Sequence, residues 1–130
     1  MAAKVISGTE VARSIENDLR QQVSEMRRLS ASFQPRMAIV QVGGREDSNV
    51  YIRMKLKAAE NIGILAEHIK LPRDCTQPEL LTKLAALNDS PLVHGIIVQM
   101  PVDSIHSMDA HLITDAVSPQ KDIDGYNDHD

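Results

Sequence analysis

A lysine and a tyrosine share one side of an expected helix, a combination that could carry acid–base chemistry. Lys55 falls among apolar residues of a helix expected over residues 47–62, with Tyr51 one turn before it. Arg53 and Lys57 fall on the opposite side, which we expect to face water. An inward amine beside a phenol can transfer protons or steady developing negative charge. The alternative is a lysine whose aliphatic stem lies along the apolar surface while its ammonium reaches solvent.

Gln99 and Asp124 are two further candidates. Gln99 is an amide inside the apolar run of residues 96–101, at the carboxyl end of an expected strand. It could equally be a structural glutamine with all its hydrogen bonds satisfied inside the fold. Asp124 precedes Gly125, and an Asp-Gly pair is ordinarily a solvated turn. The five histidines lack the paired spacing of metal ligands, and the sequence contains neither Gly-x-Gly-x-x-Gly nor a P-loop, so we expect no metal or nucleotide site.

Expected helices and strands alternate along the chain. Capping boxes begin helices at Ser7 and Thr76, and Gly63 ends the helix that carries Lys55. Two short apolar runs, stopped by Gly43 and Pro101, indicate strands, and a loose alternation closed by Pro72 indicates a third. The alternation predicts a three-layer α/β fold, with a mostly parallel sheet and helices on both faces. Ligands of such sheets bind beyond the carboxyl ends of the strands. The expected strands cover residues 37–42, 65–71 and 95–100, and the helices residues 8–29, 47–62, 76–88 and 107–117.

Length and composition limit the classes of function. The 130 residues are 42% hydrophobic and 25% charged, as in one soluble globular domain. The net charge of -4, with only two tyrosines, one phenylalanine and no tryptophan, argues against a nucleic-acid partner. The single Cys75 excludes an intrachain disulfide. No apolar run is long enough to span a membrane and no targeting signal precedes the first helix, so we expect a cytoplasmic protein.

Three segments together resemble the motifs of one enzyme family. Tyr51–Ala59 is similar to the Tyr-x-x-x-Lys-x-Lys-x-Ala signature of the methylenetetrahydrofolate dehydrogenase/methenyltetrahydrofolate cyclohydrolase family. His94–Pro101 and Pro119–Gly125 are similar to its second and third motifs. The resemblance implies a flavodoxin-like or Rossmann-like folate-binding catalytic domain over residues 1–125, followed by a tail over residues 126–130 that does not match.

The resemblance also implies a role for each candidate residue. Lys55 would be the catalytic lysine, Gln99 would hydrogen-bond to it and tune it, and Tyr51 would stack against the folate ring system. Asp124 would hold the amino group of the pterin. Ser48 would belong to the network of the lysine. The remaining substrate-binding residues would line one wall of the cleft; they are Val98, Met100 and Pro101.

The implied function lies in one-carbon folate metabolism and purine biosynthesis. It combines NADP-dependent oxidation of 5,10-methylenetetrahydrofolate with hydrolysis of 5,10-methenyltetrahydrofolate to 10-formyltetrahydrofolate. Family members continue into a second domain that binds NADP and supports a homodimer. Because residues 126–130 depart from the family pattern, we expect this chain to lack that domain, its cofactor site and its dehydrogenase activity. The alternative is a truncated form that binds folate, or associates with a longer enzyme, without turnover.

Overall fold

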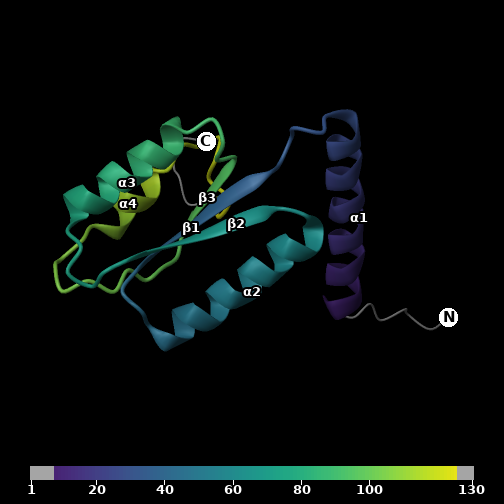
Figure 1. Ribbon diagram of the computed structural model, residues 1–130. Coiled ribbons are helices and arrows are strands. Elements are labelled where there is room, and N and C mark those ends of the chain that lie inside the picture. Colours follow the sequence, from purple (N-terminus) through teal and green to yellow (C-terminus); the bar gives the residue numbers. More distant parts are fainter. Residues whose placement is uncertain (1–7, 126–130) are drawn as a thin grey trace.

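Helices and strands alternate along the chain, as the sequence predicted. The computed structural model describes residues 8–125 (Figure 1), so the predicted cap at Ser7 and the tail over residues 126–130 lie outside the described residues. The described strands are β1 (Arg36–Val42), β2 (Leu65–Leu71) and β3 (Gly95–Val98). The described helices are α1 (Gly8–Leu29), α2 (Glu46–Ile62), α3 (Gln77–Asp89) and α4 (Ala110–Asp115).

The three strands form one parallel sheet in the order β2-β1-β3. β1 pairs along its whole length with β2, from Arg36 opposite Leu65 to Val42 opposite Leu71. On its other edge β1 pairs with all of β3. Parallel neighbours need long crossovers, and α2 and α3 provide them. The carboxyl ends of all three strands therefore share one edge of the sheet.

Alternate residues of β1 point to opposite faces of the sheet and create two cores. Ile39 packs with Ile97 of β3 and Ile52 of α2. The other face carries a larger core, to which α3 and α4 contribute. Helix α2 thus covers one face while α3 and α4 cover the other (Figure 1), which confirms the three-layer fold. The larger core includes Ala38, Val40, Val42, Leu80, Leu84, Leu87, Ile96, Val98 and Ile113.

Helix α1 lies outside these layers and packs against α2 (Figure 1). Arg20 Nε of α1 donates a hydrogen bond to the carbonyl oxygen of Asn61 at 2.5 Å, and Asn61 Nδ2 donates to Glu16 at 3.2 Å. This helix carries an apolar stripe that is only partly covered. Four of its residues keep between 39% and 53% of their surface exposed; they are Val11, Ile15, Leu19 and Met26.

Two predicted helix signals are confirmed by the backbone. Gly63 follows α2 with φ 97°, a left-handed conformation, and its N–H donates to the carbonyl oxygens of Ala59 and Glu60. Thr76 begins α3, because its hydroxyl oxygen accepts a hydrogen bond from the backbone N–H of Glu79. Each residue satisfies backbone groups that have no partner within the helix.

Two predicted boundaries are wrong. β3 ends at Val98 and not at Met100, because Pro101 has no N–H to continue the ladder with β1. The N–H of Asp103 instead donates to the last carbonyl of β1 at 3.0 Å. Helix α4 is shorter than the predicted range of residues 107–117, because the Asp109 carboxylate accepts from two backbone N–H groups of the first turn and caps the helix there.

Candidate active site

Lys55 and Gln99 meet at the carboxyl end of β3. Lys55 Nζ donates a hydrogen bond to Gln99 Oε1 at 3.0 Å, which joins α2 to the first residue after the strand. Gln99 is 8% exposed, and its Nε2 donates to the carbonyl oxygen of Met100 at 3.1 Å. The amide oxygen is thereby turned toward the lysine. The amine and the amide selected separately from the sequence are in direct contact.

The buried face of α2 differs from the predicted one. Ser48, Ile52 and Ala59 are buried against the sheet, and Lys55 is half-buried at the edge of this face. Tyr51, predicted to share the inward face, is 58% exposed. The isoleucines of β1 and β3 pack onto the Ile52 side of the helix, and this contact turns the tyrosine outward. The phenol therefore lies one turn before the lysine and is exposed to solvent.

Asp124 lies beside β3, in a chain segment that follows α4. Asp122 forms a parallel bridge with Ile96, so this segment runs along the free edge of β3. Asp124 lines a small cavity with Val98, whose side chain belongs to the core of α3 and α4. Within residues 8–125 no hydrogen bond or ion pair joins Asp124 to Lys55. The structure therefore brings Lys55 to Gln99 and leaves Asp124 apart from that pair.

Three other predicted substrate-binding residues are the sequence neighbours of Gln99, namely Val98, Met100 and Pro101. Val98 is 5% exposed and Met100 is half-buried, and both pack into the core shared with α3 and α4. Pro101 is exposed and follows a cis peptide bond. The backbone from Val98 to Pro101 thus passes beside the Lys55–Gln99 contact, with the side chains of Val98 and Met100 turned into the core.

Gln41 makes a second polar contact between the sheet and α2, and this residue was not among the predicted site residues. Gln41 is 2% exposed, and its Nε2 donates to Asn49 Oδ1 of α2 at 2.8 Å. Its Oε1 lies 2.9 Å from His68 Nε2. The register places Gln41 beside Gln99 on the same face of the sheet. The sequence carried the signal for it, since Gln41 is also an amide inside an apolar run.

The ring of His68 donates to Gln41. Gln41 Nε2 is already bound to Asn49, so the amide oxygen faces the ring and His68 Nε2 carries the proton. Burial, and then the nearby Lys70 ammonium, lower the pKa of His68. The neutral ring is thereby favoured in the folded protein.

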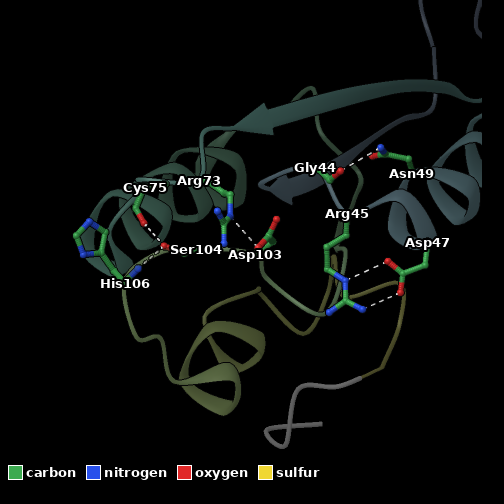
Figure 2. A network of polar contacts seen from close by, with 9 residues as sticks. All are labelled: Gly44, Arg45, Asp47, Asn49, Arg73, Cys75, Asp103, Ser104 and His106. Atoms are coloured by element: carbon green, nitrogen blue, oxygen red, sulfur yellow. Dashed lines mark hydrogen bonds and ion pairs between the residues drawn. The ribbon is translucent and has the colours of Figure 1, made fainter.

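Loops at the carboxyl edge of the sheet are joined by polar contacts (Figure 2). Arg73 pairs with Asp103 at 3.0 Å, and Arg45 pairs with Asp47 at 2.9 Å. The Arg45 guanidinium lowers the pKa of the Asp47 carboxyl. Gly43 has φ +78°, and a Cβ added there would lie 2.3 Å from the carbonyl oxygen of Asp103. Only glycine allows the loop to approach so closely.

The glycine turn after β1 does not fit a nucleotide. Gly43 and Gly44 separate β1 from α2, the place where dinucleotide-binding folds hold a pyrophosphate. Here Asp103 fills the space beside Gly43, and Glu46 and Asp47 put negative charge on the first turn of α2. Over the described range, no group of three or more His, Cys, Asp or Glu residues could hold a metal ion. No helix in that range has the length and apolar character needed to cross a membrane.

A parallel sheet with helices on both faces, and a lysine–amide pair at the carboxyl end of a strand, define a three-layer α/β domain with polar groups at the edge where such folds bind ligands. Residues 6–124 match the family described as tetrahydrofolate dehydrogenase/cyclohydrolase, catalytic domain. The chain belongs to this family.

Curated relatives are much longer than this chain. The cytoplasmic C-1-tetrahydrofolate synthase of Spodoptera frugiperda is 70% identical over 117 residues, which are 90% of this chain and 12% of the relative. The enzyme of the same name from Drosophila melanogaster is 62% identical over 123 residues, which are 95% of this chain and 13% of the relative. The chain thus spans only a small fraction of the length of the relatives that it matches.

Solved structures of the family share the fold. A 5,10-methylenetetrahydrofolate dehydrogenase from the silkworm Bombyx mori superposes with a TM-score of 0.88 at 32% identity, covering 97% of this chain and 42% of that one. The methylenetetrahydrofolate dehydrogenase-cyclohydrolase of Trypanosoma brucei, complexed with NADP and an inhibitor, has a TM-score of 0.83 at 32% identity. That comparison covers 94% of this chain and 41% of that one.

Proposed function

We propose that this chain is the folate-binding catalytic part of a bifunctional enzyme of one-carbon metabolism. Its reactions are oxidation of 5,10-methylenetetrahydrofolate and hydrolysis of 5,10-methenyltetrahydrofolate to 10-formyltetrahydrofolate. The contact between Lys55 Nζ and Gln99 Oε1 is the observation that supports this proposal most directly. The names of the relatives support a cytoplasmic location, and the NADP complex of the Trypanosoma brucei enzyme supports NADP as the oxidant. No nucleotide contact is assigned to residues 8–125.

The hydrolytic step requires proton transfers at the water that attacks the methenyl carbon and at N5, which leaves that carbon. Water adds to the cationic methenyl carbon and loses a proton, which leaves a hydroxyl group on that carbon. N5 then takes up a proton and its bond to the carbon breaks, while the hydroxyl loses its proton and becomes the formyl C=O. One proton is released overall. An amine held at the reacting carbon can accept the first proton and deliver the second. Gln99 Oε1 fixes the direction of Lys55 Nζ, and fixing a reacting group in this way lowers the entropic part of the barrier.

The surroundings of Lys55 suit a flat, partly apolar ligand. The exposed ring of Tyr51 offers a face for stacking one turn before the lysine. Ser48 is buried where α2 meets the sheet. We assign the hold on the pterin amino group to the exposed carboxylate of Asp124. The wall of the cleft is assigned to Val98, Met100 and Pro101.

Paired substitutions on α2 test the proposed hydrolysis. Lys55→Met removes the amine but keeps the length of the side chain. Lys57→Met removes the same charge two residues later, where the side chain is exposed and makes no hydrogen bond within residues 8–125. The unsubstituted chain is expected to consume 5,10-methenyltetrahydrofolate faster than buffer, as followed by its absorbance. Lys55→Met should return the rate to that of buffer, and Lys57→Met should leave it unchanged.

Equal rates for the unsubstituted chain and Lys55→Met would refute catalysis by this lysine. Calorimetric titration with a folate analogue then separates folate binding without turnover from the absence of any folate function. The exposed Tyr51 ring is the feature that favours binding without turnover. No heat of binding would remove that second function as well.

A further inference from the structure

Helix α3 ends without a basic residue of its own. The helix spans Gln77–Asp89 and has no basic side chain in its last turn, although its terminal carbonyls carry partial negative charge. Lys121, 31 to 34 residues later in the chain, supplies the cation. Its Nζ donates to the carbonyl oxygens of Leu87 at 3.0 Å, Asn88 at 2.7 Å and Ser90 at 2.8 Å. All three ammonium hydrogens are used by the backbone, so this lysine is not offered to a ligand.

The side chain of Asn88 attaches the same helix end to the chain before Lys121. Asn88 Nδ2 donates to the carbonyl oxygen of Ala116 at 2.8 Å, and its Oδ1 accepts from the N–H of Ser118 at 2.9 Å. The segment that follows α4 is therefore fixed to the end of α3 through both Asn88 and Lys121.

Beyond Lys121 the chain is held along β3. The N–H of Ile96 donates to the carbonyl oxygen of Lys121 at 2.7 Å, and the N–H of Ile123 donates back to Ile96 at 3.3 Å. Asp122 Oδ1 then accepts from the N–H of Gly125 at 3.1 Å. Asp124 is exposed and makes no hydrogen bond among the residues that the structure describes. Its position is thus set by the attachments of its neighbours.

We propose that Lys121 is a positioning residue for substrate binding. By binding the carbonyls at the end of α3, it fixes the turn over residues 122–125 and so directs the Asp124 carboxylate toward the folate. The inference rests on the proposed function, in which Asp124 contacts the pterin amino group. The Lys121 ammonium donates only to backbone carbonyls, so removing it should weaken folate binding through the position of Asp124 and not through a lost contact with the folate.

A double-mutant cycle on tetrahydrofolate affinity tests this coupling. The dissociation constant is measured by calorimetry for the chain and for Lys121→Met, Asp124→Asn and the double variant. Each single substitution is expected to weaken binding about tenfold, and the double variant should bind no more weakly than Asp124→Asn alone. Lys83→Met is the matched control, because Lys83 is an exposed residue of α3 that loses the same charge. It should bind like the unsubstituted chain.

Other outcomes of the cycle separate the two proposals. Additive losses, or unchanged binding by Lys121→Met while Asp124→Asn binds weakly, would overturn the positioning role and leave the proposed function standing. Unchanged binding by Asp124→Asn would overturn the assigned role of that carboxylate, and the positioning role with it. An unsubstituted chain that binds no tetrahydrofolate would count against the proposed function itself.

Amide hydrogen exchange measures the positioning without any ligand. Lys121→Met should speed exchange at the N–H groups of Ile96 and Ile123 at least about tenfold relative to the buried strand β1. Lys83→Met should not. If Lys121→Met fails to fold, Lys121→Gln keeps two of the donors and should show a smaller change of the same kind. Unchanged exchange in the folded variants would show that Lys121 does not hold the turn.

Discussion

Gln41 of β1 and Gln99, the first residue after β3, lie side by side, and each binds a different side chain of α2. Gln41 Nε2 donates to Asn49 at 2.8 Å, and Gln99 Oε1 accepts from Lys55 at 3.0 Å. Both amides are buried on the face of the sheet that α2 covers. The helix is therefore attached to the sheet at two successive points, and the direction of Lys55 depends on both.

Gln41→Leu should destabilise the fold, because it leaves the polar atoms of Asn49 and His68 at this contact without their partner. We expect the free energy of unfolding to fall by about 1–3 kcal/mol, as measured in urea. Gln21→Leu, an exposed change on α1, should shift it by less than about 0.5 kcal/mol. Equal stability of the two variants would contradict a structural role for the buried amide.

Gln99→Leu should impair the proposed hydrolysis more than it impairs folding. It removes the acceptor that directs Lys55 Nζ, and misplacing a reacting group costs about ten- to a hundredfold in rate. The rate of 5,10-methenyltetrahydrofolate loss and the melting temperature are measured on the same samples. Gln120→Leu, an exposed substitution in the segment after α4, serves as the control. A rate equal to that of the control would exclude a role for Gln99 in orienting the lysine.

Gly43→Ala should be costly, whereas Gly44→Ala should not. At position 43 the added Cβ would lie 2.3 Å from a backbone oxygen, and the alanine would have to keep the left-handed backbone conformation of Gly43. Strain of this kind costs about 1–3 kcal/mol. At Gly44 the nearest atom is the flexible end of Lys70, 3.4 Å away. Comparing the two free energies of unfolding checks the close approach of Asp103, and equal losses would argue against it.

The stability of the fold should decrease at alkaline pH through Cys75. Burial, and then the charges of Glu79 and Asp74, raise the pKa of this thiol. The unfolded chain therefore loses the proton first, binds fewer protons than the folded chain, and is favoured as the pH rises above about 8.5. Cys75→Ala lacks this dependence. The stability difference between the two chains should shrink from pH 7 to pH 10 in urea titrations, and a constant difference would contradict the prediction.

Most of the fold could be predicted because the main signals are local. Apolar runs bounded by Gly or Pro marked β1 and β3, and a loose alternation closed by Pro72 marked β2. Gly63 and Thr76 marked helix ends. The short α4 was predicted too long, because Asp109 begins the helix through bonds to backbone N–H groups that no apolar periodicity reveals. The order of the strands in the sheet could not be predicted, because it depends on contacts between segments that lie far apart in the sequence.

The candidate site could be predicted in part. Lys55 and Gln99 were found because each is a polar residue in an apolar setting. The prediction placed Tyr51 on the buried side of α2, but the ring is exposed. The helix has apolar residues on more than one side, and the contact with the sheet decides which side is buried. Lys121 could not have been found, because its partners are backbone carbonyls that leave no mark on side-chain patterns.

The central position of β1 has a consequence for protein synthesis. This strand leaves the ribosome before either of its neighbours, β2 and β3, exists. At about 5–20 residues per second, a nascent chain carries an unpaired apolar strand for several seconds before its second partner emerges. Such a strand is a natural binding site for chaperones and a starting point for aggregation. Translation speed between residues 42 and 98 should therefore govern how much of the newly made protein reaches the folded state.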